Sequence, residues 1–141
     1  MTICEIKLKF QNSEELVVLK DKETIKKIPL ILRAINFYKA DWEATDTIVE
    51  GPIEIPFPLE AGQFFFDNIL KYKRPAEPLK TKISEYKEAS EKSIEQLKEY
   101  MEFAEYMECD DFLRAIAFVL AKKFDKQTDA QIVPHFPAPS V

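Results

Sequence analysis

The stretch EYMEFAEYMECDDFLRAI, from Glu99 to Ile116, has the pattern of one amphipathic helix, a short break and the start of another. Side chains in a helix advance by about 100° per residue, so residues three or four apart share a face. Extended outward, this spacing predicts helices over 94–108 and 111–124. Asp110 or Asp111 is the expected N-cap of the second helix, because its carboxylate can accept a hydrogen bond from an unpaired backbone N–H.

The first of these helices carries two aromatic side chains outside its apolar stripe. Phe103 and Tyr106 lie nearly opposite the stripe, among the carboxylates of Glu99 and Glu102. Two explanations are open: a second element of the same domain covers this face, or the aromatics bind a partner. We favour the partner, because aromatic side chains with a polar tip are enriched at protein interfaces. The core stripe itself is formed by Ile94, Leu97, Met101 and Ala104.

The second helix repeats this arrangement. Phe118 projects on the far side with Arg114 and Lys122, and again either a covering element or a partner would explain it. Two helices that each carry an apolar anchor outside the core stripe indicate a partner-binding protein. The predicted core stripe is formed by Leu113, Ile116, Ala117, Leu120 and Phe124.

The residues before this helix pair predict a small sheet with helices. Apolar and charged residues alternate over 4–10, which is the period of a strand with one wet face, and a turn at 12–14 leads to a second strand. Pro56 and Pro58 confine a third strand to an edge or an end of the sheet. The expected elements are strands over 4–10, 16–19 and 53–57, helices over 24–35 and 59–73, and a loop over 38–52 around Trp42.

The remaining segments are expected to lie outside the regular core. Residues 73–93 are rich in Lys, Glu and Ser, so we interpret them either as a solvated helix or as a charged linker or mobile insert. Residues 125–141 form a C-terminal extension in which three prolines prevent a long helix. The whole pattern predicts a single α+β domain over 1–124.

Composition excludes several classes of function. The net charge of −5 argues against nucleic acid binding, which depends on clustered Lys and Arg. No apolar run approaches the roughly 20 residues that a membrane span requires, and no secretory leader is evident. We therefore expect a soluble protein of the cytoplasm, the nucleus or both, with no membrane partner.

Groups for catalysis, metals or cofactors are also scarce. The single His, His135, lies in the proline-rich extension, and Gly51 and Gly62 are too far apart for a phosphate-binding loop. Cys4 and Cys109 lie within apolar patterns and are interpreted as core-filling thiols. We expect no enzyme activity, no metal site and no cofactor.

Three stretches resemble a known family: KETIKKIPLILRAI, EIPFPLEAGQFFFDNILKYK and LKEYMEFAEYMECDDFLRAIAFVLAKKF. The chain resembles the Skp-type adaptors of SCF ubiquitin ligases and elongin C, over most of residues 3–136. The resemblance implies a BTB/POZ fold, with a small mixed three-stranded sheet packed against about five to six helices.

The resemblance also implies two protein interfaces. In the family an Asn-Tyr pair faces the cullin scaffold; Tyr106 stands at the Tyr and Glu105 replaces the Asn. The implied scaffold surface is Glu99, Glu102, Phe103, Glu105 and Tyr106. The last helices bind the receptor, which is an F-box protein in the Skp family. The implied receptor surface is Leu113, Ala117, Phe118, Leu120, Ala121, Ile132 and Phe136.

These features together predict a non-catalytic adaptor that bridges an F-box-like, helix-bearing substrate receptor to a cullin. The alternative is a BTB-fold structural subunit that self-associates as a homodimer or scaffolds a complex unrelated to ubiquitin ligation. Glu105 and the short C-terminal region, where Skp-type adaptors continue into a helical tail, favour this alternative somewhat.

Overall fold

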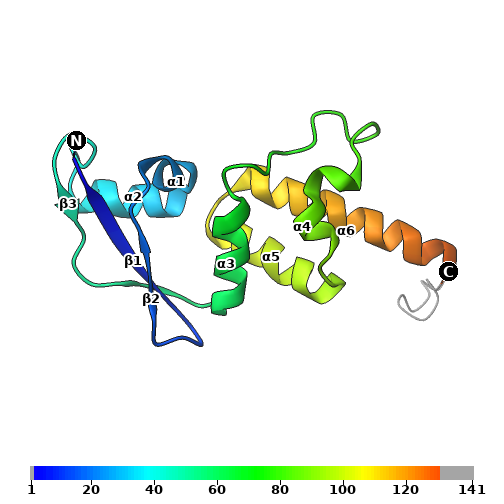
Figure 1. Cartoon of the computed structure of the whole chain (residues 1–141), viewed down its shortest axis with the longest axis horizontal. Helices are drawn as coiled ribbons and strands as arrows, with labels where there is room; N and C mark the ends of the chain where they lie inside the picture. The colour runs from blue at the N-terminus through cyan, green and yellow to red at the C-terminus, as the bar shows by residue number, and fades with distance from the viewer. Residues whose placement is uncertain (1, 131–141) are drawn as a thin grey trace.

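The computed structural model describes residues 2–130, with side chains for residues 2–125, and within this range the fold is α+β. Figure 1 shows the sheet with helices α1 and α2 at one end, helices α4, α5 and α6 at the other, and α3 between them. The elements are β1 (Cys4–Phe10), β2 (Leu16–Leu19), α1 (Lys22–Lys27), α2 (Pro29–Tyr38), β3 (Thr47–Ile48), β4 (Ile53–Ile55), α3 (Leu59–Asn68), the 3₁₀ helix η1 (Ile83–Tyr86), α4 (Lys87–Ser90), α5 (Ile94–Tyr106) and α6 (Asp110–Ala130).

Strand β1 is the centre of a small mixed sheet. It pairs antiparallel with β2 through the predicted hairpin, and parallel with both β3 and β4. Cys4 pairs with Thr47 at one end of β1, and Leu8 pairs with Ile53 farther along the same strand. The alternating burial of β1 confirms the period of two that the sequence predicts. Within the described residues the sheet has four strands, so the expected number of three was wrong; the missed strand, β3, has only two residues.

The predicted helix over 24–35 is two helices. Asp21 caps α1 by accepting a hydrogen bond from the backbone N–H of Thr24. Ile28 is extended between the two helices, and Pro29 begins α2, where a missing N–H costs little. Pro29 therefore marks the boundary between two helices where the spacing of apolar residues predicted one.

Helix α3 contacts the last residue of β1, Phe10, and the turn that follows it. Its first backbone N–H, at Leu59, donates to the side-chain oxygen of Asn12 in the β1–β2 turn, 2.8 Å away, which ties the helix to the hairpin. Gly62 faces the ring of Phe10 and leaves no room for a Cβ. Phe64 and Phe65 are buried as the helical spacing predicts.

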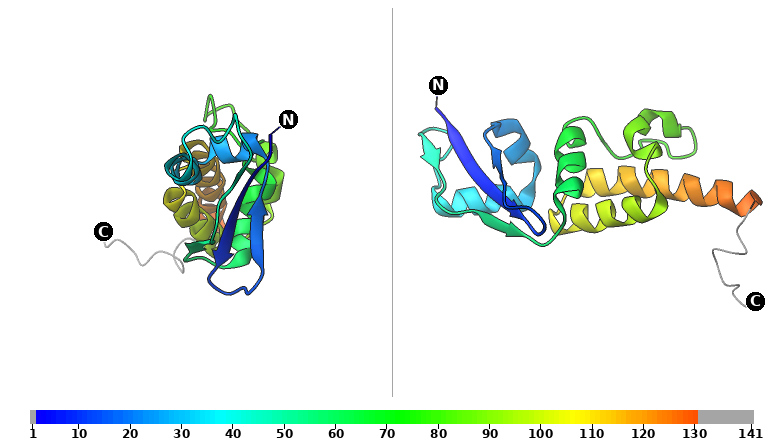
Figure 2. Two further views of the ribbon diagram at one scale, coloured as in Figure 1. Left: turned by 90° about the vertical axis from the view of Figure 1, so that its left-hand side faces the viewer. Right: turned by 60° about the horizontal axis from the view of Figure 1, so that its bottom comes forward.

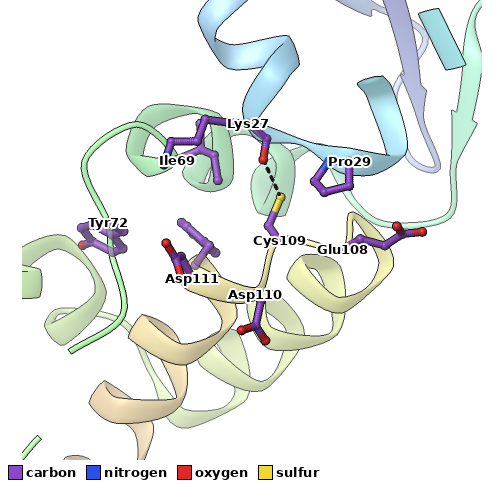
Figure 3. A pocket seen from close by; sticks show the side chains of 9 residues that line it. Lys27, Pro29, Ile69, Tyr72, Glu108, Cys109, Asp110 and Asp111 are labelled. Atoms are coloured by element: carbon purple, nitrogen blue, oxygen red, sulfur yellow. Dashed lines mark hydrogen bonds between the residues drawn. The ribbon is translucent and has the colours of Figure 1, made fainter. Parts of the chain in front are cut away.

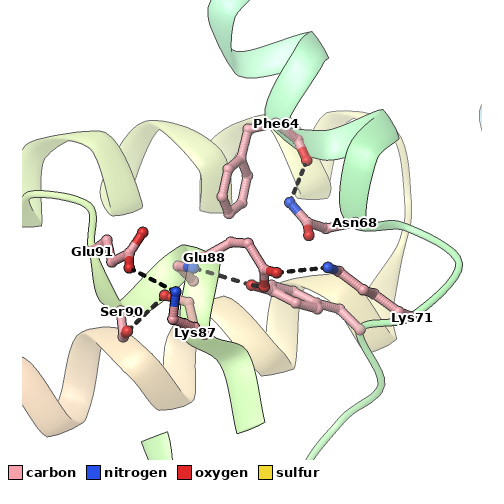
Figure 4. A network of polar contacts seen from close by, with 9 residues as sticks. Phe64, Asn68, Lys71, Lys87, Glu88, Ser90 and Glu91 are labelled. Atoms are coloured by element: carbon pink, nitrogen blue, oxygen red, sulfur yellow. Dashed lines mark hydrogen bonds and ion pairs between the residues drawn. The ribbon is translucent and has the colours of Figure 1, made fainter. Parts of the chain in front are cut away.

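Residues 83–90 are helical and packed, which differs from the linker expected over 73–93. The buried ring of Tyr86 lies 5.1 Å from that of Tyr72, and Ala89 is fully buried. Polar contacts hold α4: the Tyr72 hydroxyl donates to Glu88 and accepts from the backbone N–H of Ala89. Lys71 also pairs with Glu88, at 2.7 Å (Figure 4). Two buried residues are too few to produce a clear helical period, so the sequence did not distinguish a helix from a linker in this segment.

Helices α5 and α6 are antiparallel and lie side by side (Figures 1 and 2). Both were expected, but α6 continues beyond 124 to Ala130 before the proline-rich residues begin. No helix within residues 2–130 has the length and apolar character needed to cross a membrane.

Candidate protein-interaction surface

The α5–α6 pair is positioned by local signals at each end of α5. Ser93 and Gln96 form a reciprocal capping box, so α5 begins at Ile94. It ends at Tyr106, and Glu108 then takes a positive φ of 63° while the backbone N–H of Cys109 donates to the carbonyl of Ala104. This tight reversal turns the chain so that α6 packs back along α5.

Phe103 is fully buried, so its assignment to a scaffold surface was wrong. Its ring packs against Phe57, Phe65 and Phe10, with centroids 5.2, 5.0 and 6.0 Å away. These partners come from β1, from α3 and from the segment between β4 and α3. The alternative that a second element of the domain covers this face is therefore correct for Phe103. Helix α5 is buried on two sides, which a single-stripe interpretation does not allow.

Tyr106 remains at the surface with part of the predicted scaffold group. Its side chain is 37% exposed, and one side of its ring rests on Phe57 at 5.5 Å. Glu102 and Glu105 are exposed, and Glu99 is half-buried. This side of α5 therefore presents one anchored aromatic ring among carboxylates.

A groove of about 560 Å³ runs between α5 and α6. Half-buried apolar side chains form its floor, namely Met101 from α5 and Leu113 and Ala117 from α6, with the nearly buried Leu120 beside them. Its charged lining residues are Lys98, Glu102, Glu105 and Arg114. The groove thus brings together residues that the sequence had assigned to two separate interfaces.

The core stripe of α6 is rotated from the predicted one. The buried residues are Phe112, Ala115, Ile116, Val119 and Leu120, whereas Leu113, Ala117 and Phe124 are only half-buried. Phe112 packs on Phe65, with ring centroids 4.8 Å apart, and this contact turns Leu113 and Ala117 toward the groove. The predicted stripe combined residues that line the groove with residues of the core. Both groups are apolar and lie next to each other around the helix axis, so the sequence does not separate them.

The other residues of the predicted receptor surface are not in the groove. Phe118 is half-buried on the α4 side, with its ring 5.9 Å from that of Tyr86 and the Lys122 ammonium 5.4 Å above it. Ala121 is exposed and does not line the groove. Ile132 and Phe136 lie outside the described residues.

The first turn of α6 carries a charge cluster instead of the predicted N-cap. The helix begins at Asp110, so Asp110 and Asp111 lie inside its first turn, where negative charge is favourable. Arg74 pairs with both carboxylates, and Arg33 pairs with Glu108 at 2.5 Å. These ion pairs attach the α5–α6 reversal to α2 and to the segment after α3.

Cys109 lies beside this reversal in a small cavity of about 210 Å³ (Figure 3). Its thiol lies 3.6 Å from the carbonyl oxygen of Lys27 and is directed toward it. Burial raises the pKa of Cys109 to about 12, so the thiol is protonated and a poor nucleophile. Cys4 is also buried, and both cysteines are free, which agrees with core-filling roles.

Sequence reasoning missed Lys98 and Arg114 as lining residues of the groove, and it missed a second hollow on α2. That hollow, of about 770 Å³, lies over Leu30, Ala34 and Phe37, and Phe37 is 95% exposed. Leu30, Ala34 and Phe37 follow the i, i+4, i+7 spacing that could have indicated it beside the buried stripe of Ile28, Ile31 and Ile35.

A scan against models of known protein families finds no match, and a search of the curated proteins finds none either.

Proposed function

We propose that this chain is a non-catalytic BTB/POZ adaptor, similar to Skp-type adaptors and elongin C, that links a helix-bearing receptor to the cullin of a ubiquitin ligase in the cytoplasm or nucleus. The order of elements supports the proposal: a hairpin and two helices, two short parallel strands, α3, and a terminal antiparallel helix pair. The observation that carries it is the apolar groove between α5 and α6.

The groove suits one face of an amphipathic helix. Met101, Leu113, Ala117 and Leu120 offer an apolar floor, and anchors spaced at i, i+3 or i+4 and i+7 on a partner helix would reach successive positions along it. The small side chain of Ala117 leaves room for a large anchor at the middle of the floor. Glu102 on the α5 rim favours a partner helix with Lys or Arg on the side that faces α5.

Tyr106 is the proposed contact for the cullin, and Phe103 has no part in it. The ring of Tyr106 is already fixed against Phe57, so binding orders little additional side chain, and its hydroxyl end is available to a partner. Glu105 contributes acceptor oxygens only, so its counterpart on the scaffold should be a donor or a cation.

The mechanism of such an adaptor is positional. It holds the receptor and its substrate near the ubiquitin-transferring end of the scaffold, and the effect comes from the raised local concentration of substrate. No residue of the adaptor is assigned a step in bond chemistry.

The test is affinity purification of the tagged chain from its own cells, followed by mass spectrometry. We expect a cullin and an F-box-like receptor. Ala117→Arg, which fills the groove, should remove the receptor and keep the cullin, whereas Tyr106→Lys should remove the cullin and keep the receptor.

Ala34→Arg is the matched control, since Ala34 is also a half-buried helical alanine that lines a hollow, but on α2. Thermal unfolding of each purified variant establishes that it is folded. A stable complex that contains neither a cullin nor a helix-bearing receptor would overturn the proposal.

A further inference from the structure

Strand β2 forms an exposed edge of the sheet. It pairs with β1 on one side only, and the sheet order places no strand on its other side within residues 2–130 (Figure 2). In an antiparallel edge strand, alternate backbone N–H and C=O groups point away from the neighbouring strand. None of these outward groups has a hydrogen-bond partner among the described residues. They are available to a further strand.

The side chains of β2 do little to discourage such pairing. Natural edge strands are protected by charged residues, proline or bulges, but Leu16–Leu19 is apolar throughout, and only its shortness is protective. Leu16 and Val18 lie on the outer face of the sheet, with 40% and 41% of their surface exposed. They form an apolar pair that a neighbouring strand would cover.

The charges that flank β2 make it complementary to itself. Glu14 lies in the bend that precedes the strand and Lys20 directly follows the strand, and both residues are exposed. Glu14 makes no ion pair with any described residue. The Lys20 side chain is 70% exposed, and its one ion pair, with Glu5, is long at 3.8 Å. Both charges are therefore free to meet a partner.

A single antiparallel register satisfies all of these side chains. With a two-fold axis at Val17, Leu16 lies opposite Val18 of the second copy, and the bend that carries Glu14 lies beside Lys20 of the second copy; the symmetry repeats both contacts. The strand itself, Leu16–Leu19, carries no charge, so no like charges oppose each other within the paired segment. Directly opposed opposite charges and apolar pairs are the contacts that stabilise antiparallel strands.

We propose that two copies of this chain associate through β2 and join their sheets into one continuous antiparallel seam. The occupant of the edge is a second copy, because the acidic end and the basic end of one strand match the reversed order of the same strand. Helices α5 and α6 lie beyond α3 from the sheet, so each copy keeps its groove accessible (Figure 1). The dimer thus carries two grooves, and its formation does not depend on which partner binds in them.

The test is sedimentation velocity of the purified chain from low micromolar to millimolar concentration. We expect a reversible monomer–dimer equilibrium. Glu14→Lys and Lys20→Glu each place like charges beside each other at two symmetric positions, and each should weaken dimerisation roughly tenfold or more. The double variant Glu14→Lys/Lys20→Glu restores opposite charges with reversed sign and should recover the dimer.

Lys80→Glu is the control, because it makes the same charge change at an exposed residue far from β2 in the sequence. Glu14→Lys disturbs no ion pair among the described residues, so this variant tests the register even if Lys20→Glu, which removes the contact with Glu5, destabilises the fold. A protein that stays monomeric at millimolar concentration would overturn the proposal. A dimer that is indifferent to all three variants would place the interface elsewhere, such as the α2 hollow, and would also overturn it.

Discussion

Replacing Gly62 with alanine tests the packing of α3 against the sheet. A Cβ at this position would lie 2.3 Å from Cζ and 2.4 Å from Cε2 of Phe10, well inside van der Waals contact. Phe10 is fully buried and its ring packs 6.0 Å from that of Phe103, so it has little space to retreat. Overpacking of this kind costs up to about 3 kcal/mol, whereas exchanging glycine for alanine within a helix gains about 1 kcal/mol.

We therefore expect Gly62→Ala to lower the free energy of unfolding by about 2 kcal/mol, measured by urea denaturation with circular dichroism. The double variant Gly62→Ala/Phe10→Leu supplies the control. Because the shorter leucine removes the clashing ring atoms, Gly62→Ala should cost much less in the Phe10→Leu background than in the parent chain. Equal costs in both backgrounds, or a parent chain stabilised by alanine, would refute the reasoning.

Two further predictions concern α5 and the contacts of α4. Phe103→Ala should lower the free energy of unfolding by about 3–5 kcal/mol, since the ring is fully buried, while Tyr106→Ala should cost clearly less; equal losses in urea melts would contradict the assigned burial. The hydrogen bond from Lys71 lowers the pKa of Glu88 from 4.5 to about 2, so its contribution is present above pH 4.5 and is lost as the pH falls toward 2. The Glu88 side chain is nearly half exposed, which limits this contribution to about 1 kcal/mol or less. Urea melts of Lys71→Met between pH 5 and pH 2 should therefore show a smaller loss of stability than the parent chain. An unchanged dependence of stability on pH would show that the Lys71–Glu88 pair does not cause the loss.

The sheet and its hairpin could be predicted because their signals are local. The alternation in β1, the turn before β2 and the prolines after β4 each act within a few residues. Strand β3 could not be predicted in the same way. It consists of Thr47 and Ile48, and its pairing with Cys4 and Glu5 depends on the course of the whole chain between them.

The candidate surface could be predicted only in part, because it too depends on contacts between residues that are far apart in the sequence. A helical wheel orders side chains around an axis but does not say how many neighbours the helix has. Phe103 is buried because β1, α3 and Phe57 all meet on its side of α5, and none of these lies nearby in sequence. Leu113 and Ala117, which the sequence analysis had selected, line the groove, but the groove also depends on Met101 from the facing helix.

The central place of β1 has a consequence for how the chain folds. The hairpin with β2 can close locally, but the parallel partners of β1 are encoded far downstream, at Thr47–Ile48 and Ile53–Ile55. Closing such long loops is entropically costly before the new contacts compensate, and non-local pairing slows folding. During synthesis the side of β1 that pairs with β3 and β4 therefore stays without a partner strand until residues 47–55 have emerged from the ribosome. This interval is when a nascent chain of this kind most needs a chaperone.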